Sequence, residues 1–361
     1  MAQSSLVHPT LGPLGVDLDL TADFRQPNYQ LQVEHLLKVA EHQLIMGTTQ
    51  YRGENILTIL NNINVVTIPA NVSVLNSNTR TANEPNLSLE SYFFSDTWKA
   101  GKSLILEGAV YFDRLQNSNA ATGTEWQLNQ WSPRLGLIFT PTRRDTLRLA
   151  VFRYLSPFIA SRIDPMDVAG VPVFRNFREG SRVDEVDMVW EREWARGYLA
   201  ANLFYLEKKF EHLDNQPFLE ADYGRLKGLE LALNQLIGSG FGLALKYRYQ
   251  DVVDEANLPN LRGDREDHLA STGLRYLHRS GLSSSLTETY RYERFRTGSF
   301  EDEHIWLTDA AVGYEFPRKR GSVNLEMRNI FNQHFNWITD QFVFAGRAPV
   351  RETLLTLAVN F

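Results

Sequence analysis

Apolar and polar residues alternate along the last stretch of the chain, Arg351 to Phe361. The apolar residues that share one parity are Leu355, Leu357, Val359 and Phe361. Successive side chains of a β-strand point to opposite faces, so this pattern predicts a strand with one apolar and one mostly polar face. A final aromatic residue on an exposed apolar face is unfavourable in water but not in a bilayer. The pattern therefore indicates a strand that faces lipid on one side.

A similar alternation begins near the N-terminus, between Leu14 and Phe24. Aliphatic residues alternate there with the acids Asp17, Asp19 and Asp23. Acids on one face and aliphatic side chains on the other suit a strand between a wet lumen and a lipid exterior. We expect this strand to pair with the final strand and close a barrel, with residues 1–13 as a lead-in.

The same period-two pattern recurs along the chain and predicts about sixteen strands. Besides those two, we expect strands near residues 29–39, 43–51, 87–98, 102–114, 126–140, 145–156, 182–194, 198–209, 223–234, 241–251, 268–277, 282–295, 304–316 and 322–332. An even number places both ends of the chain on one side of a closed antiparallel sheet. The prediction is a single all-β domain over residues 1–361, a transmembrane antiparallel up-and-down β-barrel.

The links between these predicted strands are alternately short and long. The short ones, such as Ala100-Gly101 and Pro317 to Gly321, contain glycine, proline and serine, as tight turns require. The longer ones are 52–86, 115–125, 157–181, 210–222, 252–267 and 333–350. This asymmetry is typical of outer-membrane barrels, whose short turns are periplasmic. We predict that the asparagine-rich loop 52–86 and the loop 157–181 gate the lumen.

Composition agrees with a membrane barrel. Of 361 residues, 43% are hydrophobic and 12% are aromatic, without an apolar run of the roughly eighteen residues that a membrane helix needs. A closed barrel also satisfies every backbone group in a bilayer. A soluble β-sandwich, propeller or β-helix would alternate too. However, sandwich strands are shorter, at about five or six residues, and the chain has no repeat of fixed period.

Charge and cysteine content exclude other classes. The net charge of −6 argues against a nucleic-acid partner, and the absence of cysteine excludes disulfides and thiolate metal sites. We expect no cofactor. The chain opens on the polar residues MAQSS, which do not form a secretory signal. A signal peptide or a periplasmic partner domain is therefore expected upstream.

The charged residues on the polar parity of the strands are candidates for the lumen wall. They are Asp17, Asp19, Asp23, Glu34, Arg134, Arg148, Glu185, Asp187, Glu230, Lys246, Arg248, Glu326 and Arg328. Such residues could set selectivity for a solute. Alternatively, they form a mixed cross-strand ladder that stiffens the wall, which the interspersed signs favour. The loop 157–181 is rich in proline, valine and phenylalanine. It either folds into the lumen as a constriction, binds a ligand at the mouth, or forms an apolar cap that packs on the other outer loops.

Aromatic residues fall near both predicted interfaces. Tyr247 and Tyr249 lie towards the outer one, and Trp194, Tyr314, Phe316 and Phe361 lie towards the inner one. Two further clusters combine acids with histidine, and their weak candidates for a divalent cation are Asp267, His268, Glu303 and His304. Solvated strand ends explain these clusters as well, so we expect no metal.

Three stretches resemble the C-terminal barrel of TonB-dependent receptors. They are Ser132 to Leu137 with Leu147-Arg148-Leu149, Gly228 to Leu231 with Phe241 to Tyr249, and Arg328-Asn329-Ile330-Phe331-Asn332 with the terminal Phe361. The alternation that ends at Phe361 is also similar to the assembly signal of outer-membrane barrels. Those receptors have about twenty-two strands and a plugged lumen. A plug-less chain of about sixteen strands is also similar to porins and to exopolysaccharide-secretion barrels, which have an aqueous lumen.

Together, these features favour a non-enzymatic protein of the bacterial outer membrane. No nucleophile, phosphate-loop or metalloprotease motif is present. The first hypothesis is a channel that passes a hydrophilic solute or an exported polymer such as a polysaccharide. The alternatives are a ligand-binding receptor barrel of the TonB-dependent type without its plug, and a structural or adhesive anchor. Expected partners are outer-membrane lipid and lipopolysaccharide, and the barrel assembly machinery through the C-terminal strand.

Overall fold

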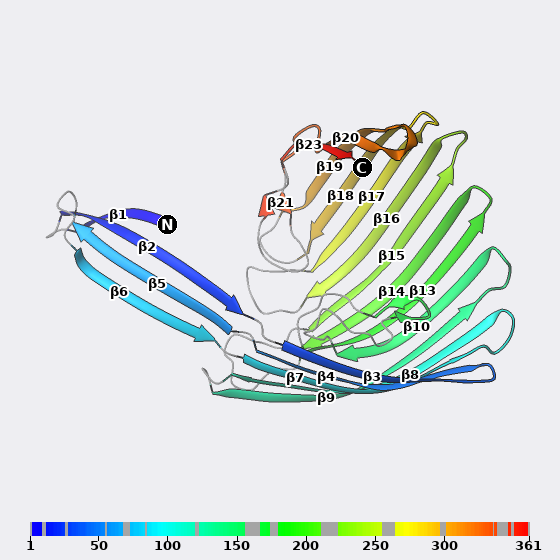
Figure 1. Cartoon of the computed structure of the whole chain (residues 1–361), viewed down its shortest axis with the longest axis horizontal. Coiled ribbons are helices and arrows are strands. Elements are labelled where there is room, and N and C mark those ends of the chain that lie inside the picture. The colour runs from blue at the N-terminus through cyan, green and yellow to red at the C-terminus, as the bar shows by residue number, and fades with distance from the viewer. Residues whose placement is uncertain are drawn as a thin grey trace. The chain divides into compact units, whose positions relative to one another are not determined.

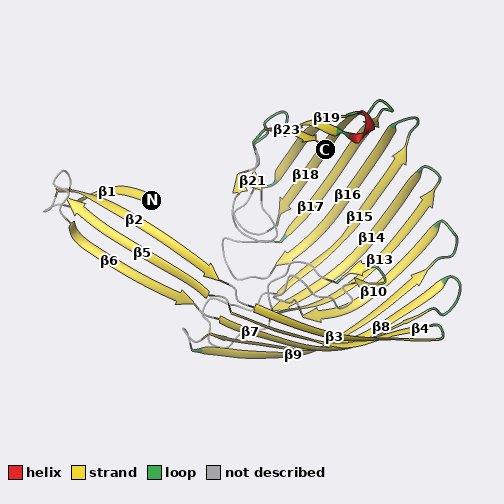
Figure 2. Ribbon diagram, in the orientation of Figure 1, coloured by secondary structure: helices red, strands yellow, loops and turns green. Residues whose placement is uncertain are grey.

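The computed structural model consists almost entirely of antiparallel strands (Figure 2). It describes residues 2–8, 12–25, 28–54, 56–67, 73–83, 85–119, 123–155, 167–173, 180–210, 223–254, 264–296, 301–334, 336–337, 346–347 and 350–359. The described residues include a single helical element, the short η1 (Pro317–Lys319), and no helical plug. None of the helical structure described is long and apolar enough to cross a membrane.

One sheet contains fifteen strands, and neighbours along the chain are mostly neighbours in the sheet. Its order is β23 (Glu352–Val359), β20 (Gly321–Arg328), β19 (Glu303–Glu315), β18 (Leu282–Phe295), β17 (Arg265–Leu277), β16 (Phe241–Asp254), β15 (Tyr223–Leu236), β14 (Gly197–Phe210), β13 (Ser181–Trp194), β10 (Asp145–Leu155), β9 (Thr124–Phe139), β8 (Leu104–Asn119), β7 (Pro85–Trp98), β4 (His42–Glu54) and β3 (Asn28–Val39). Figure 1 shows β13 to β18 side by side as long strands. The predicted all-β, up-and-down class is confirmed.

A second, four-stranded sheet has the order β1 (Ala2–His8), β2 (Gly12–Arg25), β5 (Ile56–Thr67) and β6 (Ser73–Asn83). Two predictions are therefore wrong. Residues 52–86 are not one long loop, because they contain β5 and β6. In addition, the N-terminal strand pairs with β1 and β5, whereas β23 pairs with β20. The predicted link 115–125 is also mostly strand, because β8 extends to Asn119 and β9 begins at Thr124.

Contacts within the chain divide it into two compact units. The first comprises Met1–His35, Ile45–Phe94 and Tyr111–Trp131, and the second comprises Leu36–Leu44, Ser95–Val110 and Ser132–Phe361. The second unit contains the long strands from β10 onwards. That residues 1–361 form one barrel, with residues 1–13 as a lead-in, stays a prediction.

Each long strand of the second unit has two chemically different faces. In β10 and β13, apolar residues such as Leu149 and Met188 are exposed, while the residues between them are partly or fully buried. The cross-strand register carries this parity from strand to strand, as in the pairs Leu203–Leu229 and Leu231–Tyr247. We call the face with the exposed aliphatic residues the outer face and the opposite one the inner face. Exposed aliphatic side chains in such numbers suit a lipid environment.

The short links form as predicted, and glycine is needed where they turn. Gly281, between β17 and β18, has φ +92°, and a Cβ there would collide with the carbonyl oxygen of Glu315. We call the strand ends that these turns join the short-link end, and the opposite ends the long-link end.

Candidate functional site: the inner face and its folded hairpin

A small hairpin from the predicted gating loop 157–181 lies on the inner face of the second unit. It consists of β11 (Asp167–Val168) and β12 (Val171–Pro172). The two residues between them, Ala169 and Gly170, have φ +53° and +79°. Positive φ at both central positions is the requirement of a type I′ turn, which is the tight turn that best matches strand twist. The chain can therefore reverse within two residues, and the resulting hairpin is narrow.

Apolar side chains attach the hairpin to the wall. Val168, Val171 and Val173 of the hairpin segment belong to one buried cluster. Its other members come from the inner face of β10, β13 and β14, and they are Ala150, Phe152, Tyr154, Val183 and Leu206. Burying apolar area stabilises the contact by about 25 cal/mol per Å². The described valines of this loop therefore pack against the inner face. This is the placement expected if the loop folds into the lumen, and the loop's phenylalanines lie outside the described residues.

Polar contacts fix the hairpin tip. The backbone N–H of Ala169 donates to Oε2 of Glu107 at 2.6 Å, and its carbonyl oxygen accepts from Nη1 of Arg148 at 3.1 Å. Nε of Arg148 also donates to Glu191 at 2.8 Å, and Glu191 accepts from the Tyr198 hydroxyl at 2.8 Å. Side chains from β8 and β10 thus hold the backbone N–H and carbonyl of Ala169, and residues of β13 and β14 hold Arg148 in turn. Hydrogen bonds to charged groups are among the stronger ones in proteins.

The tip lies far from the long-link end. Arg148 is close to Asp145, where β10 begins, and Glu191 is close to Trp194, where β13 ends. Both positions are near the short-link end. The hairpin tip therefore lies on the inner face near the short-link end of β10. Gly136 of β9 allows this approach, because a Cβ there would lie 3.0 Å from Val168 Cγ1 and 3.1 Å from Ala169.

The structure places the described lumen candidates on the inner face. Arg134, Glu185 and Asp187 are buried there, and the register puts Arg134 and Glu185 on either side of Phe152. Further along the sheet, Glu230 and Arg248 are direct cross-strand partners. Their pairing is the arrangement that a mixed ladder predicts. A role in selectivity stays a prediction.

The remaining candidates are less informative. Arg328 contacts Glu326 at 2.6 Å and Glu352 at 4.0 Å, and Lys246 lies opposite Ala232. In the first unit, Glu34 accepts from Gln32 at 2.6 Å. The side chains of Asp17, Asp19 and Asp23 lie outside the described residues.

A row of carboxylates lies on the inner face, and the sequence analysis named two of its members only as weak cation candidates. Asp267, Glu293 and Glu303 are consecutive cross-strand partners on β17, β18 and β19. Arg265 contacts Asp267 at 3.1 Å, and Arg291 contacts Glu293. Strand parity alone could have identified Glu293, but the predicted strand at 268–277 began too late to include Arg265 and Asp267.

The weak metal candidates do not converge. Asp267 and His268 are consecutive in β17, and Glu303 and His304 are consecutive in β19, so each pair is divided between the two faces. Within the described ranges, no group of three or more histidine, aspartate or glutamate side chains could hold a metal ion.

The two histidines instead join an aromatic row on the outer face. Tyr247 and Tyr249, both predicted girdle residues, lie beside His268, with ring centroids 6.3 Å and 5.0 Å away. The row continues through Tyr292, His304, Tyr290 and Trp306, with neighbouring centroids 4.5–6.2 Å apart. We call these seven residues the aromatic row. It crosses β16 to β19 and contains more residues than the sequence suggested.

Part of the predicted girdle at the short-link end lies within the described residues. Trp194 Nε1 donates to Gln235 at 2.9 Å, and the rings of Tyr314 and Phe316 meet edge to face at 5.8 Å. Leu355, Leu357 and Val359 of β23 are all exposed. Phe361 lies outside the described residues. Their roles as girdle and assembly signal stay predictions.

Comparison with known proteins identifies related folds. A family model described as TonB dependent receptor-like, beta-barrel, matches residues 7–330. No curated protein matches.

Several solved structures share the fold at low sequence identity. The closed form of the ferric-catecholate import receptor Fiu from K12 E. coli has 14% identity and a TM-score of 0.61 over 97% of this chain and 56% of its own. The unliganded ferric citrate transporter FecA has 11% identity and a TM-score of 0.63 over 99% of this chain and 57% of its own. The copper transporter OprC has 10% identity and a TM-score of 0.66 over 97% of this chain and 58% of its own. The chain thus spans little more than half the length of these proteins.

Proposed function

Because the chain belongs to the TonB-dependent receptor-like β-barrel family, we propose that it forms the barrel of an uptake receptor in the outer membrane. The family consists of outer-membrane barrels of Gram-negative bacteria, and this chain is one of them. Its members are receptors and transporters rather than enzymes. In this proposal, loops at the long-link end capture a hydrophilic ligand, and the β11–β12 hairpin narrows the path along the inner face.

The inward hairpin is the single observation that carries this proposal. A wide passive channel needs an unobstructed wall, whereas this wall has a valine-rich hairpin packed against the inner face of β10, β13 and β14. Both the apolar cluster and the contacts of Glu107 and Arg148 would have to break before the hairpin could leave. An obstruction with two kinds of attachment suits a gated receptor.

A chelated metal is the ligand class to test first. The related structures include a ferric-catecholate import receptor, a ferric citrate transporter and a copper transporter. Inner-face cations such as Arg248 and Lys246 would attract an anionic chelate.

Ligand binding by the purified full chain in detergent tests the proposal. The chain contains 7 tryptophans, so we would measure their fluorescence during titration with ferric citrate, a ferric catecholate and a copper chelate. We expect saturable quenching by at least one complex and none by the metal-free chelator. Equal, unsaturable quenching by every complex would contradict a receptor role.

A second candidate is a channel for a hydrophilic solute or an exported polymer such as a polysaccharide. The mixed charges of Glu230, Lys246 and Arg248 on the inner face favour it, because a polar wall accommodates hydrated sugars. Conductance separates the two candidates. A steady, large conductance that neutral polymers of medium size reduce would favour the channel.

A further inference from the structure

A groove of about 580 Å³ lies on the inner face at the short-link end of β14 to β18. The described residues of the β11–β12 hairpin do not line it. Neighbouring strands are about 4.8 Å apart, so a row across five strands is roughly 19 Å long. The central row of the groove consists of direct cross-strand partners, which are Tyr198, Asn234, Ala244, Gly273 and Thr287. We call this hollow the short-link groove.

The groove is hollow because small residues form its floor. A Cβ at Gly242 would meet only Leu236 Cδ2, at 3.9 Å, and a Cβ at Gly273 would have no neighbour closer than 3.7 Å. The hydroxyl groups of Ser285 and Thr287 belong to the lining. A polar ligand can therefore lie along the groove and form several hydrogen bonds.

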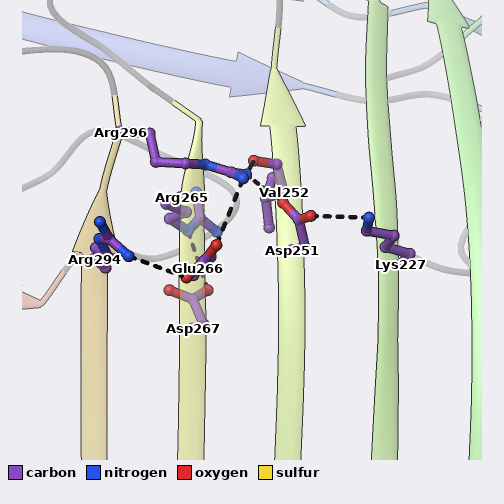
Figure 3. A network of polar contacts seen from close by, with 8 residues as sticks. All are labelled: Lys227, Asp251, Val252, Arg265, Glu266, Asp267, Arg294 and Arg296. Carbon is purple, nitrogen blue, oxygen red and sulfur yellow. Dashed lines mark hydrogen bonds and ion pairs between the residues drawn. The ribbon is translucent and has the colours of Figure 1, made fainter.

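Two exposed arginine side chains give the groove a positive charge. They are Arg196, in the turn before β14, and Arg275 of β17. Within the described part of the chain, neither guanidinium has an ion pair or a hydrogen bond, and no described lining residue is acidic. Figure 3 shows the opposite arrangement at the long-link end, where carboxylates hold the cations, as Asp251 holds Lys227 at 3.2 Å. Guanidinium groups without carboxylate partners leave the groove ready for an anion, and their planar fork matches a carboxylate.

Three hydrogen bonds connect the wall of the groove to the hairpin tip. The Tyr198 hydroxyl donates to Oε1 of Glu191 at 2.8 Å, and Oε2 of Glu191 accepts from Nε of Arg148 at 2.8 Å. Nη1 of Arg148 then donates to the carbonyl oxygen of Ala169 at 3.1 Å. A phenol has a single O–H, so Tyr198 donates either to Glu191 or to a ligand in the groove.

From this geometry we propose that the short-link groove binds a carboxylate-bearing metal chelate, and that its occupancy releases the hairpin through Tyr198 and Glu191. Arg196 and Arg275 bind the carboxylates, and Tyr198 turns its hydroxyl to the ligand. Glu191 then loses one donor and meets the negative charge of the ligand. Arg148, which Glu191 orients, holds the hairpin tip less firmly as a result.

This inference rests on the proposed receptor function and adds a site on the inner path that controls the hairpin. Tyr198 and Glu191 are positioning residues in it. The coupling is reciprocal, so a ligand that loosens the hairpin binds more tightly once the hairpin has left.

The dimensions favour a chelate with several carboxylates over a small anion. Arg196 precedes β14 and Arg275 lies on β17, three strand spacings or roughly 14 Å away. A single phosphate or carboxylate reaches one of these guanidiniums only. A larger complex can place a carboxylate on each of them and contact the hydroxyl groups between them.

Site-specific cysteine labelling of the full chain in detergent would test the proposal, with ferric citrate as the probe. The chain has no native cysteine, so each introduced cysteine reports on one place. Ser285→Cys reports occupancy of the groove, and Ser271→Cys, on the same face but outside the lining, is its control. Val168→Cys reports release of the hairpin, because Val168 is buried in the seated hairpin. Heat-modifiable migration in gels verifies that each variant is folded.

Two substitutions separate binding from coupling. Arg275→Gln removes one guanidinium, and Arg279→Gln, in the turn that follows β17 and outside the lining, is its control. Tyr198→Phe removes the hydroxyl that joins the groove to the hairpin. Its control is Tyr205→Phe, because Tyr205 of the same strand is exposed on the outer face and donates to Glu207.

In the wild-type background, ferric citrate should protect Ser285→Cys saturably, leave Ser271→Cys unprotected and accelerate Val168→Cys labelling severalfold over the same concentrations. Arg275→Gln should shift both responses to roughly tenfold higher concentration, because a charge-assisted contact is lost. With Tyr198→Phe the groove should still be protected, but the Val168→Cys rate should be the same with and without the probe. Both control variants should respond like the wild type.

Absent protection of Ser285→Cys, or protection that Arg275→Gln leaves unchanged, would overturn the site. A Val168→Cys rate that ignores ferric citrate, or one that still responds with Tyr198→Phe, would overturn the link to the hairpin. Equal effects of inorganic phosphate would also overturn the proposal, because the groove would then bind any anion. The receptor function fails in a different way, namely when no chelate quenches the tryptophan fluorescence of the wild type, and this inference then fails with it.

Discussion

At the scale of single residues, Arg148 joins the hairpin tip to the wall. It donates to the carbonyl oxygen of Ala169 and to Glu191. The chain has no native cysteine, so a cysteine introduced at the buried Val168 would be labelled only when the hairpin leaves its site. In this background, Arg148→Ala should raise the labelling rate roughly tenfold, because a hydrogen bond to a charged group contributes about 1.5–3 kcal/mol.

The matched control for Arg148→Ala is Arg248→Ala. Arg248 also lies on the inner face, but its cross-strand partners are Glu230 and Leu269 rather than hairpin residues. Its removal should leave the labelling of Val168→Cys unchanged. The same acceleration in both variants would mean that Arg148 stabilises the wall in general rather than the hairpin.

A second residue-scale prediction concerns Gly136. An alanine Cβ there would lie 3.0–3.1 Å from Val168 and Ala169, whereas a Cβ at Gly108 of the neighbouring strand would meet nothing within 4 Å. Gly136→Ala should therefore displace the hairpin and accelerate Val168→Cys labelling, and Gly108→Ala should not. Unchanged labelling in Gly136→Ala would show that the hairpin does not depend on this close approach.

The sequence predicted which face of a strand each side chain lies on, but not which residues that side chain contacts. Strand parity correctly placed Arg148, Glu185 and Arg248 on the polar face. It could not assign Glu107 or Tyr198 to the site, because their contacts depend on where the hairpin reverses. The φ of +53° at Ala169 is rare for a residue other than glycine, and no local pattern announces it.

At the scale of elements, the last strand provides a direct test of the outer face. Leu357 is exposed on the outer parity of β23, and Thr356 beside it has the inner parity. A charge on the lipid side of a barrel strand costs up to about 2–4 kcal/mol at the membrane midplane, and aspartate costs less than arginine. Leu357→Asp should reduce the folded, outer-membrane fraction severalfold, measured by heat-modifiable migration of purified membranes.

Thr356→Asp is the control for this strand. It introduces the same charge one position away on the inner parity, where polar residues are tolerated. The folded fraction should stay close to that of the wild type. Comparable losses in the two variants would contradict the assignment of faces in β23.

Each strand predicted from the alternation is present in the structure. One apolar and one polar face give a strand's sequence a clear period of two. The alternation failed for β5 and β6, where Asn61, Asn62, Asn64, Asn76 and Asn78 suggested a loop. Asparagine is depleted in strands, but antiparallel pairing supplies the backbone hydrogen bonds whatever the side chains are. The pairs Asn62–Asn78 and Asn64–Asn76 lie directly opposite each other in the ladder. Such pairing is a long-range property that a local pattern does not contain.

At the scale of the whole molecule, family membership, the lipid-facing outer surface and the folded hairpin lead to one description. The chain is an outer-membrane barrel of the TonB-dependent receptor-like family, and we propose that its inner path is narrowed from within. Resemblance in three short stretches indicated the family, whereas the first hypothesis from the sequence was a channel, with the receptor as an alternative. We propose that the hairpin on the inner face favours the receptor.

Single-channel conductance in a planar bilayer tests this central claim most directly. We would compare the full chain with a variant that lacks residues 167–173, and with a control that has an equally long deletion within residues 211–222. The account predicts a small conductance for the wild type and the control, and a severalfold larger, steadier one without the hairpin, since the path widens. Equal conductance in all three proteins would contradict the claim that the hairpin narrows the path.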